Sequence, residues 1–251
     1  MTTQSLYTEE YRVRTFELDF QRIWKPSWAF QVLTEAATRH AGRLGFDYRD
    51  LWQNNQAWVL SRMKVRFLKY PTDGQNITLR TWPRGIVQKL FFMRDFEVMD
   101  ESGDVLMLAT SAWVLVDTQA RRFLLPQVLK TELPDNSGRK VMDETLDKLT
   151  GFNGMQPRFE VTPGYSEVDL VGHVNNARYV EWIANCFPME QFQYQRIAWL
   201  QVNYLAEVKA GERVALSAAP STEDEQRWLV EGSNLTSGAR AFEAAVQWRA
   251  A

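Results

Sequence analysis

The chain contains two copies of one sequence pattern, and this internal repeat limits the possible folds more than any other feature. Residues 65–79 match residues 202–216 without a gap, at a constant separation of 137. A glycine turn and a closing tryptophan in residues 103–113 recur in residues 238–248 at a separation of 135. Upstream, the acidic stretch 15–19 aligns in sequence with the stretch that ends at Asp169, at a separation of 150. The chain is therefore expected to use one structural unit twice.

Each copy is expected to consist of a strand, one long amphipathic helix and then several strands. Apolar side chains with helical spacing predict a helix in each copy: Leu33, Ala36, Ala37, His40, Ala41 and Leu44 in the first, and Ala177, Val180, Ala184 and Phe187 in the second. Pro26 and Ser27 are a start signal for the first helix. Asn175 or Asn176 can cap the second, and Pro188 ends it.

Apolar runs separated by glycine turns follow each helix and predict antiparallel strands. The expected strands are 63–70, 75–82, 90–99 and 105–116, then 198–205, 213–218, 227–233 and 239–248. A helix with one apolar stripe and a sheet with one apolar face can both bury their apolar surface when the sheet curls round the helix. The fold class is therefore α+β, with two strand-helix-sheet repeats whose sheets join edge to edge into one continuous sheet.

Three segments are expected along the chain. Residues 1–118 form the first repeat and residues 157–251 the second. Residues 119–156, which are rich in proline, asparagine and charge, fit neither copy and are the connector.

Composition excludes several functions. A net charge of −2 and the lack of a Lys/Arg block argue against nucleic acid as a partner. The single cysteine, Cys186, excludes an internal disulfide, and two histidines are too few for a metal set, so we expect no metal and no cofactor. No signal segment or membrane span is evident, which predicts a cytoplasmic protein that does not bind membranes.

The most polar stretch of the second repeat is residues 165–179, read as a strand end, a glycine turn and the first turn of a helix. It contains Asp169, His173 and two adjacent amides, which is more polar functionality than a packed core needs. Alone, His173 would more often be structural, but the turn glycine and the amides favour a functional histidine. His40, on the apolar stripe of its helix, is expected to serve packing.

The pattern Asp-x-x-Gly-His-Val-Asn-Asn-x-x-Tyr, from Asp169 to Tyr179, resembles the signature of hotdog-fold thioesterases. Over nearly its full length the chain resembles the acyl-acyl-carrier-protein thioesterases. The stretches that support this wider resemblance are residues 73–82, 94–96, 103–114 and 121–122. The resemblance implies a tandem double hotdog fold. It also implies an enzyme that hydrolyses the thioester of a fatty acyl chain on acyl carrier protein and releases the fatty acid.

The resemblance also supplies a candidate site. It implies that Asp169, His173 and Glu207 are catalytic: Glu207 as the base for water, His173 as its partner in proton transfer, and Asp169 as an orienting carboxylate, with exchange of these roles left open. Glu207 could instead be a solvated strand-end charge, and Asp169 a cap of the junction. Backbone N–H groups of Gly172, Val174 and Asn175, at a helix start, are expected to bind the substrate's oxyanion.

The chain departs from the family at two positions. Val171 replaces an asparagine, and Val208 replaces a cysteine that often follows the glutamate of plant members. A cysteine nucleophile is therefore not supported, and an activated water remains. In the first repeat Tyr70 occupies the place of Glu207, so only the second repeat is equipped for catalysis. The first is expected to line an acyl tunnel with its helix, residues 28–44.

Two other function classes stay open. One is an acyl-coenzyme A thioesterase or hydratase of the same fold, against which the lack of a Gly-rich nucleotide cradle argues mildly. The other is a non-enzymatic module that binds fatty thioesters, although no output domain is evident. The expected partner is acyl carrier protein, and the basic side chains of Arg84, Lys89 and Arg178 could bind this acidic protein. A homodimer is left open.

Overall fold

The computed structural model describes residues 5–129 and 133–251, which form two compact units. Residues 1–4 of the predicted first repeat and 130–132 of the predicted connector lie outside the described residues. The second unit consists of Asp147–Ala251 together with Pro26–Phe30 and Lys64–Phe67. The first unit consists of the other described residues up to Leu146.

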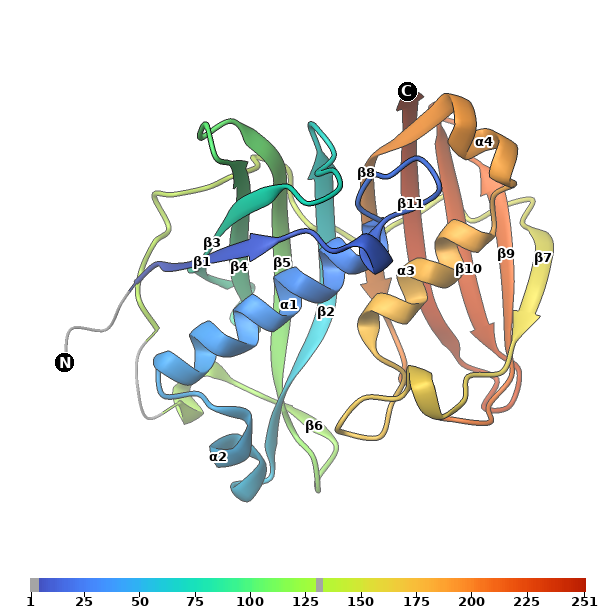
Figure 1. Ribbon diagram of the computed structural model, residues 1–251. Helices are drawn as coiled ribbons and strands as arrows, with labels where there is room; N and C mark the ends of the chain where they lie inside the picture. The colour runs from blue at the N-terminus through green and yellow to red at the C-terminus, as the bar shows by residue number, and fades with distance from the viewer. Residues whose placement is uncertain (1–4, 130–132) are drawn as a thin grey trace. The chain divides into compact units, whose positions relative to one another are not determined.

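The first unit is a strongly paired antiparallel sheet with one long helix on its face (Figure 1). The strands run in the order β1-β3-β4-β5-β2. Their bounds are Tyr7–Arg12 for β1, Gln56–Phe67 for β2, Asn76–Val87 for β3, Phe91–Asp100 for β4 and Val105–Asp117 for β5. Helix α1 is Pro26–Arg43, helix α2 is Tyr48–Gln53, and the short strand β6, Arg122–Leu124, pairs with β5.

The second unit repeats this plan (Figure 1). Its strands run in the order β8-β11-β10-β9-β7. Their bounds are Gln156–Val161 for β7, Gln195–Tyr204 for β8, Val214–Pro220 for β9, Arg227–Asn234 for β10 and Arg240–Ala250 for β11. Helix α3, Asn176–Asn185, lies across the sheet, and α4, Met189–Tyr194, follows it.

The predicted apolar stripes form the contacts between helix and sheet. Leu33 on α1 and Ile183 on α3 are fully buried, because each helix turns one face to its sheet. His40 is also fully buried, as predicted, and its ring stacks on Tyr7 with the centroids 5.7 Å apart. Its Nδ1 lies 2.9 Å from Nη1 of Arg94, so Nδ1 must accept and the imidazole is neutral, because a guanidinium only donates.

The main elements agree with the sequence prediction, but some details differ. Strand β2 begins at Gln56 rather than at residue 63. Tyr165–Glu167, read from the sequence as a strand end, forms a 3₁₀ helix, and the outer strands β1 and β7 lie further upstream. The leading strand of each repeat was thus expected too close to its helix, and the short helices α2 and α4 were not predicted, because segments this short carry no clear periodicity.

Candidate active site

A tight turn before α3 presents His173. The Asp169 amide donates to the His173 carbonyl at 2.8 Å, and the Gly172 amide donates back to the Asp169 carbonyl at 3.1 Å. Oδ1 of Asp169 accepts from the amides of Val171 and His173 at 3.0 and 3.4 Å. Gly172 has φ +87°, a left-handed conformation that glycine adopts without steric cost. The turn therefore depends on Asp169 as a side-chain cap and on Gly172 for its backbone.

Glu207 reaches His173 from the loop that follows β8. The Val174 amide donates to the Val208 carbonyl at 2.8 Å and so joins this loop to the turn. Nε2 of His173 lies 3.1 Å from Oε2 of Glu207, within hydrogen-bond distance. The two side chains are 28% and 47% exposed, so a small substrate group or a water can reach both. The structure thus brings together the two residues predicted as base and proton-transfer partner.

The contacts of Asp169 go to backbone amides, which matches its alternative interpretation as a cap. The first repeat gives an independent check, because Asp19 makes the same turn at the matching position. Oδ1 of Asp19 accepts from the amides of Gln21 and Ile23 at 2.8 and 3.2 Å, and the Asp19 amide donates to the Ile23 carbonyl at 2.9 Å. A carboxylate that makes these bonds in both repeats serves the turn itself, so Asp169 positions His173 through the backbone.

The first repeat has this turn without the reactive side chains. Ile23 stands where His173 stands, and the amide of its neighbour Trp24 donates to the Pro71 carbonyl at 2.9 Å, as Val174 does to Val208. Tyr70 stands where Glu207 stands. The two turns share their backbone bonds and differ in the groups that could move a proton.

The backbone amides expected to bind an oxyanion are already engaged. The amides of Gly172 and His173 donate to Asp169, that of Val174 to the Val208 carbonyl, and that of Asn175 to the Glu167 carbonyl at 2.9 Å. This corrects the expectation for Gly172, Val174 and Asn175, since an N–H bound inside the protein is not free for a substrate. For Val174 the sequence could not show this, because the acceptor lies on the loop that follows β8.

Asn175 is the N-cap of α3, as predicted. Its Oδ1 accepts from the Ala177 amide at 2.9 Å, and its carbonyl accepts from the Arg178 amide at 2.9 Å. Because Oδ1 is the acceptor here, the Nδ2 group of Asn175 remains a donor at the positive end of the helix.

Tyr179, the last residue of the motif, lies behind the site. It is buried, and burial raises the pKa of its hydroxyl well above the ordinary value, with the carboxylates of Glu207 and Asp169 adding to the rise. Its ring packs edge-on against Tyr204 and Phe242, with centroids 5.4 and 5.5 Å away. Tyr179 is therefore a neutral wall of the site that ties α3 to the sheet.

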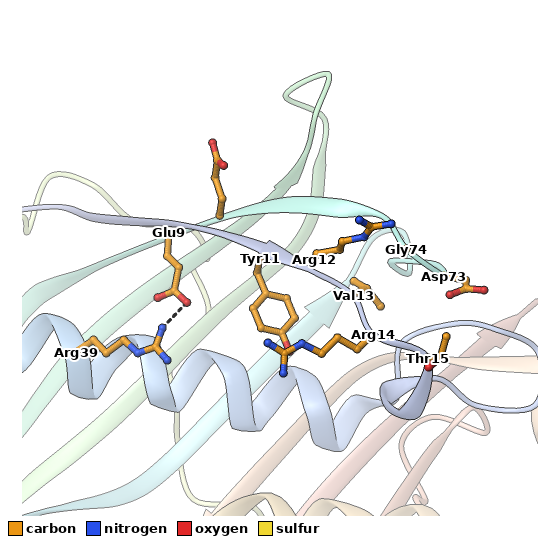
Figure 2. Close-up of a pocket in the computed structure, with 10 residues that line it drawn as sticks. Glu9, Tyr11, Arg12, Val13, Arg14, Thr15, Arg39, Asp73 and Gly74 are labelled. Carbon is orange, nitrogen blue, oxygen red and sulfur yellow. Dashed lines mark hydrogen bonds and ion pairs between the residues drawn. The ribbon is translucent and has the colours of Figure 1, made fainter.

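A separate pocket of about 460 Å³ lies in the first unit (Figure 2). Charged side chains of β1 and the segment after it line much of it, among them Glu9, Arg12 and Arg14, together with Arg39 of α1. Arg39 pairs with Glu9 at 2.6 Å (Figure 2). Such a lining does not suit a fatty chain. The acyl tunnel along residues 28–44 therefore stays a prediction.

The described residues hold no metal cluster and no membrane-spanning helix. Among residues 5–129 and 133–251, no group of three or more His, Cys, Asp or Glu side chains could hold a metal ion. No helix in the described part of the chain has the length and apolar character needed to cross a membrane. Cys186 is buried in the second unit, and burial raises the pKa of its thiol to about 12, which is unsuitable for a nucleophile.

Comparison with known proteins agrees with this architecture. Residues 4–130 match the model of the acyl-ACP thioesterase N-terminal domain, and residues 155–250 match the model of its C-terminal domain. A chloroplastic acyl-[acyl-carrier-protein] hydrolase of Cuphea viscosissima is 25% identical over 97% of the chain and 62% of its own length. Other curated relatives are covered over about half of their length, 50% and 52% in two cases.

Solved structures have the same fold across the whole chain. An acyl-ACP thioesterase from Bacteroides thetaiotaomicron is 25% identical, with a TM-score of 0.82 over 99% of this chain and 100% of that one. The 12:0-ACP thioesterase from Umbellularia californica is 24% identical, with a TM-score of 0.83 over 99% and 98%. The chain has the tandem double hotdog fold, and it belongs to the acyl-ACP thioesterase family.

Proposed function

We propose that the protein hydrolyses the thioester of fatty acyl-acyl carrier protein and releases free fatty acid. The observation that carries this proposal is the 3.1 Å contact between His173 and Glu207, found in one of two otherwise matched turns. Family membership and the names of the relatives support the carrier-protein thioester as the substrate.

In the proposed reaction Glu207 accepts a proton from a water whose oxygen attacks the thioester carbon. The carbon–sulfur bond of the resulting tetrahedral intermediate then breaks. The proton passes through the Glu207–His173 hydrogen bond to the leaving sulfur, so the products are a fatty acid and the carrier thiol. The partial exposure of both side chains leaves room for the water and the thioester.

The oxyanion of the intermediate needs a donor, and the amides of residues 172–175 are occupied. We assign this role to the Nδ2 group of Asn175, whose Oδ1 is held by the Ala177 amide. It lies at the N-terminus of α3, where the helix dipole favours negative charge.

A hydrolysis assay over matched series of acyl-carrier-protein and acyl-coenzyme A thioesters tests the function. His173→Ala and Glu207→Gln should each lower turnover by about two to four orders of magnitude, the range for a positioned proton-transfer group. Higher kcat/KM on the coenzyme A series would favour the alternative thioesterase, and binding without turnover would favour the acyl-binding module.

Tyr70→Glu is the matched control in the first repeat, because Ile23 still replaces the histidine there. This variant should keep the turnover of the wild type. Full turnover in folded His173→Ala and Glu207→Gln proteins would refute the site.

A further inference from the structure

A basic surface lies at one end of the sheet of the first unit. It consists of two segments, the β3–β4 hairpin at residues 84–90 and the turn after β5 with strand β6 at residues 118–125. Phe92 of β4 pairs with Trp113 of β5, and two residues further along β5 Leu115 pairs with Leu124 of β6. Leu124 also packs against the core cluster that contains Phe92 and Leu115. The hairpin and β6 therefore meet along the same strand.

Three exposed cations of this surface are unpaired in the part of the chain that the structure describes. Among these residues the side chains of Lys89, Arg121 and Arg122 form no ion pair and no hydrogen bond. The two segments contain no acidic residue. Asp117, which directly precedes the second segment, accepts from two amides of its own turn at 3.0 and 2.8 Å. The surface therefore carries positive charge that the unit itself does not neutralise.

Two of the three cations predicted to bind the carrier protein are engaged elsewhere. Nη1 of Arg84 lies 3.4 Å from Oδ1 of the fully buried Asp95, and the Arg84 side chain is only 12% exposed. Nη1 of Arg178 lies 2.9 Å from Oε1 of Glu181. Lys89 is the one of the three that can take a new partner, and the structure adds Arg121 and Arg122 at the same end of the sheet.

Large apolar side chains are exposed on the same two segments. Ile86 and Val87 are 46% and 45% exposed, and Phe123 and Leu125 are 63% and 55% exposed. The Leu90 amide donates to the Val87 carbonyl at 3.2 Å, so the tip of the hairpin is a closed turn. One exposed apolar side chain is ordinary, but four of them among unpaired cations are typical of a protein–protein interface with an apolar centre and a charged rim.

The matching hairpin of the second repeat has the opposite charge. Strands β9 and β10 correspond to β3 and β4, and the loop between them, residues 221–226, contains Glu223, Asp224 and Glu225 and no basic residue. The same hairpin is thus cationic in one repeat and anionic in the other. An acidic protein is attracted to the first and repelled by the second.

We propose that this basic surface is where acyl carrier protein docks: Lys89, Arg121 and Arg122 pair with acidic side chains of the carrier, and Phe123 packs against an apolar side chain between them. The proposal rests on the proposed function, in which the carrier protein brings the thioester. An anionic membrane would meet the same charges, but the carrier is favoured because the chain belongs to a family named for it.

The double variant Arg121→Gln and Arg122→Gln tests the cations, because both side chains are exposed and their loss leaves the core intact. Its KM for acyl-ACP should rise about 3- to 10-fold while kcat stays within about twofold, since exposed ion pairs contribute modestly to binding. Hydrolysis of an acyl-N-acetylcysteamine thioester, which has no carrier protein, should not change. Salt at about 0.5 M should raise the KM of the wild type toward that of the variant.

The matched control is Thr222→Glu with Gln226→Glu, which makes the same change in net charge at the hairpin of the second repeat. The control should keep the KM of the wild type, and an equal rise in both double variants would overturn the docking surface.

Titration with holo-acyl carrier protein, which carries no acyl chain, separates this proposal from the proposed function. Weaker carrier binding by the arginine variant would support the surface even if the wild type hydrolysed no acyl-ACP. Wild-type carrier binding and wild-type KM in this variant would overturn the surface even if acyl-ACP were the substrate. If the variant instead lost binding to phosphatidylglycerol vesicles and kept carrier binding, the surface would belong to a membrane and the proposal would be wrong.

Discussion

A tight steric constraint in the second unit lies at Gly232, and replacing this glycine should damage the sheet behind the site. A Cβ at this position would lie 2.1, 2.6 and 2.9 Å from three ring carbons of Phe242, the residue paired with it across β10 and β11. Carbon atoms are comfortable at about 3.5–4.0 Å, so the ring would have to move by roughly 1.5 Å. The ring is fully buried and packs edge-on against Tyr179, which leaves it little room.

Overpacking of a well-packed core costs about 1–3 kcal/mol, and this site should lie at the upper end. For a chain of this size each kcal/mol lowers Tm by about 2–4 °C, so Gly232→Ala should melt roughly 6–12 °C below the wild type. Thermal and urea unfolding followed by circular dichroism measure this. Ser233→Ala, at the next position of β10, adds no atoms and is the matched control.

Phe242→Leu provides the decisive comparison, because it removes the ring atoms that the new Cβ would meet. In a double-mutant cycle, Gly232→Ala and Phe242→Leu should couple by about 1 kcal/mol or more, so that Gly232→Ala costs less in the leucine background. Stability of Gly232→Ala within about 0.5 kcal/mol of the wild type, or additive effects, would refute the reasoning.

Three further predictions concern the site and its surroundings. Gly172→Ala should lower the free energy of unfolding by only about 1–2 kcal/mol, because φ is +87° but no atom lies within 4 Å of the new Cβ, and Arg22 adopts φ 64° in the matching turn. A loss above about 4 kcal/mol in urea unfolding would contradict this. Asp19→Ala and Asp169→Ala should each destabilise the protein by about 1 kcal/mol through the same lost cap, but only the second should lower turnover, as paired melting and hydrolysis measurements would show. Cys186 should resist iodoacetamide at about pH 8 in the native protein and react in denaturant, because burial raises its pKa to about 12; rapid native labelling followed by mass spectrometry would count against its burial.

The repeat and its periodicities were sufficient to predict the fold class. The stripes on α1 and α3 are read from residues three and four apart, and the cap by Asn175 depends on the next two residues, so both are local properties of the sequence. The contact of His173 with Glu207 was expected only through the family resemblance, because helix α3 and strand β8 separate the two residues along the chain.

Tertiary structure decided which groups are available for chemistry. The amides of Val174 and Asn175 are taken by carbonyls of Val208 and Glu167, acceptors that a local pattern does not identify. Sequence determines local structure through neighbours along the chain, whereas hydrogen-bond partners and electric fields depend on distances in space, which exist only after the sheet and helix have packed.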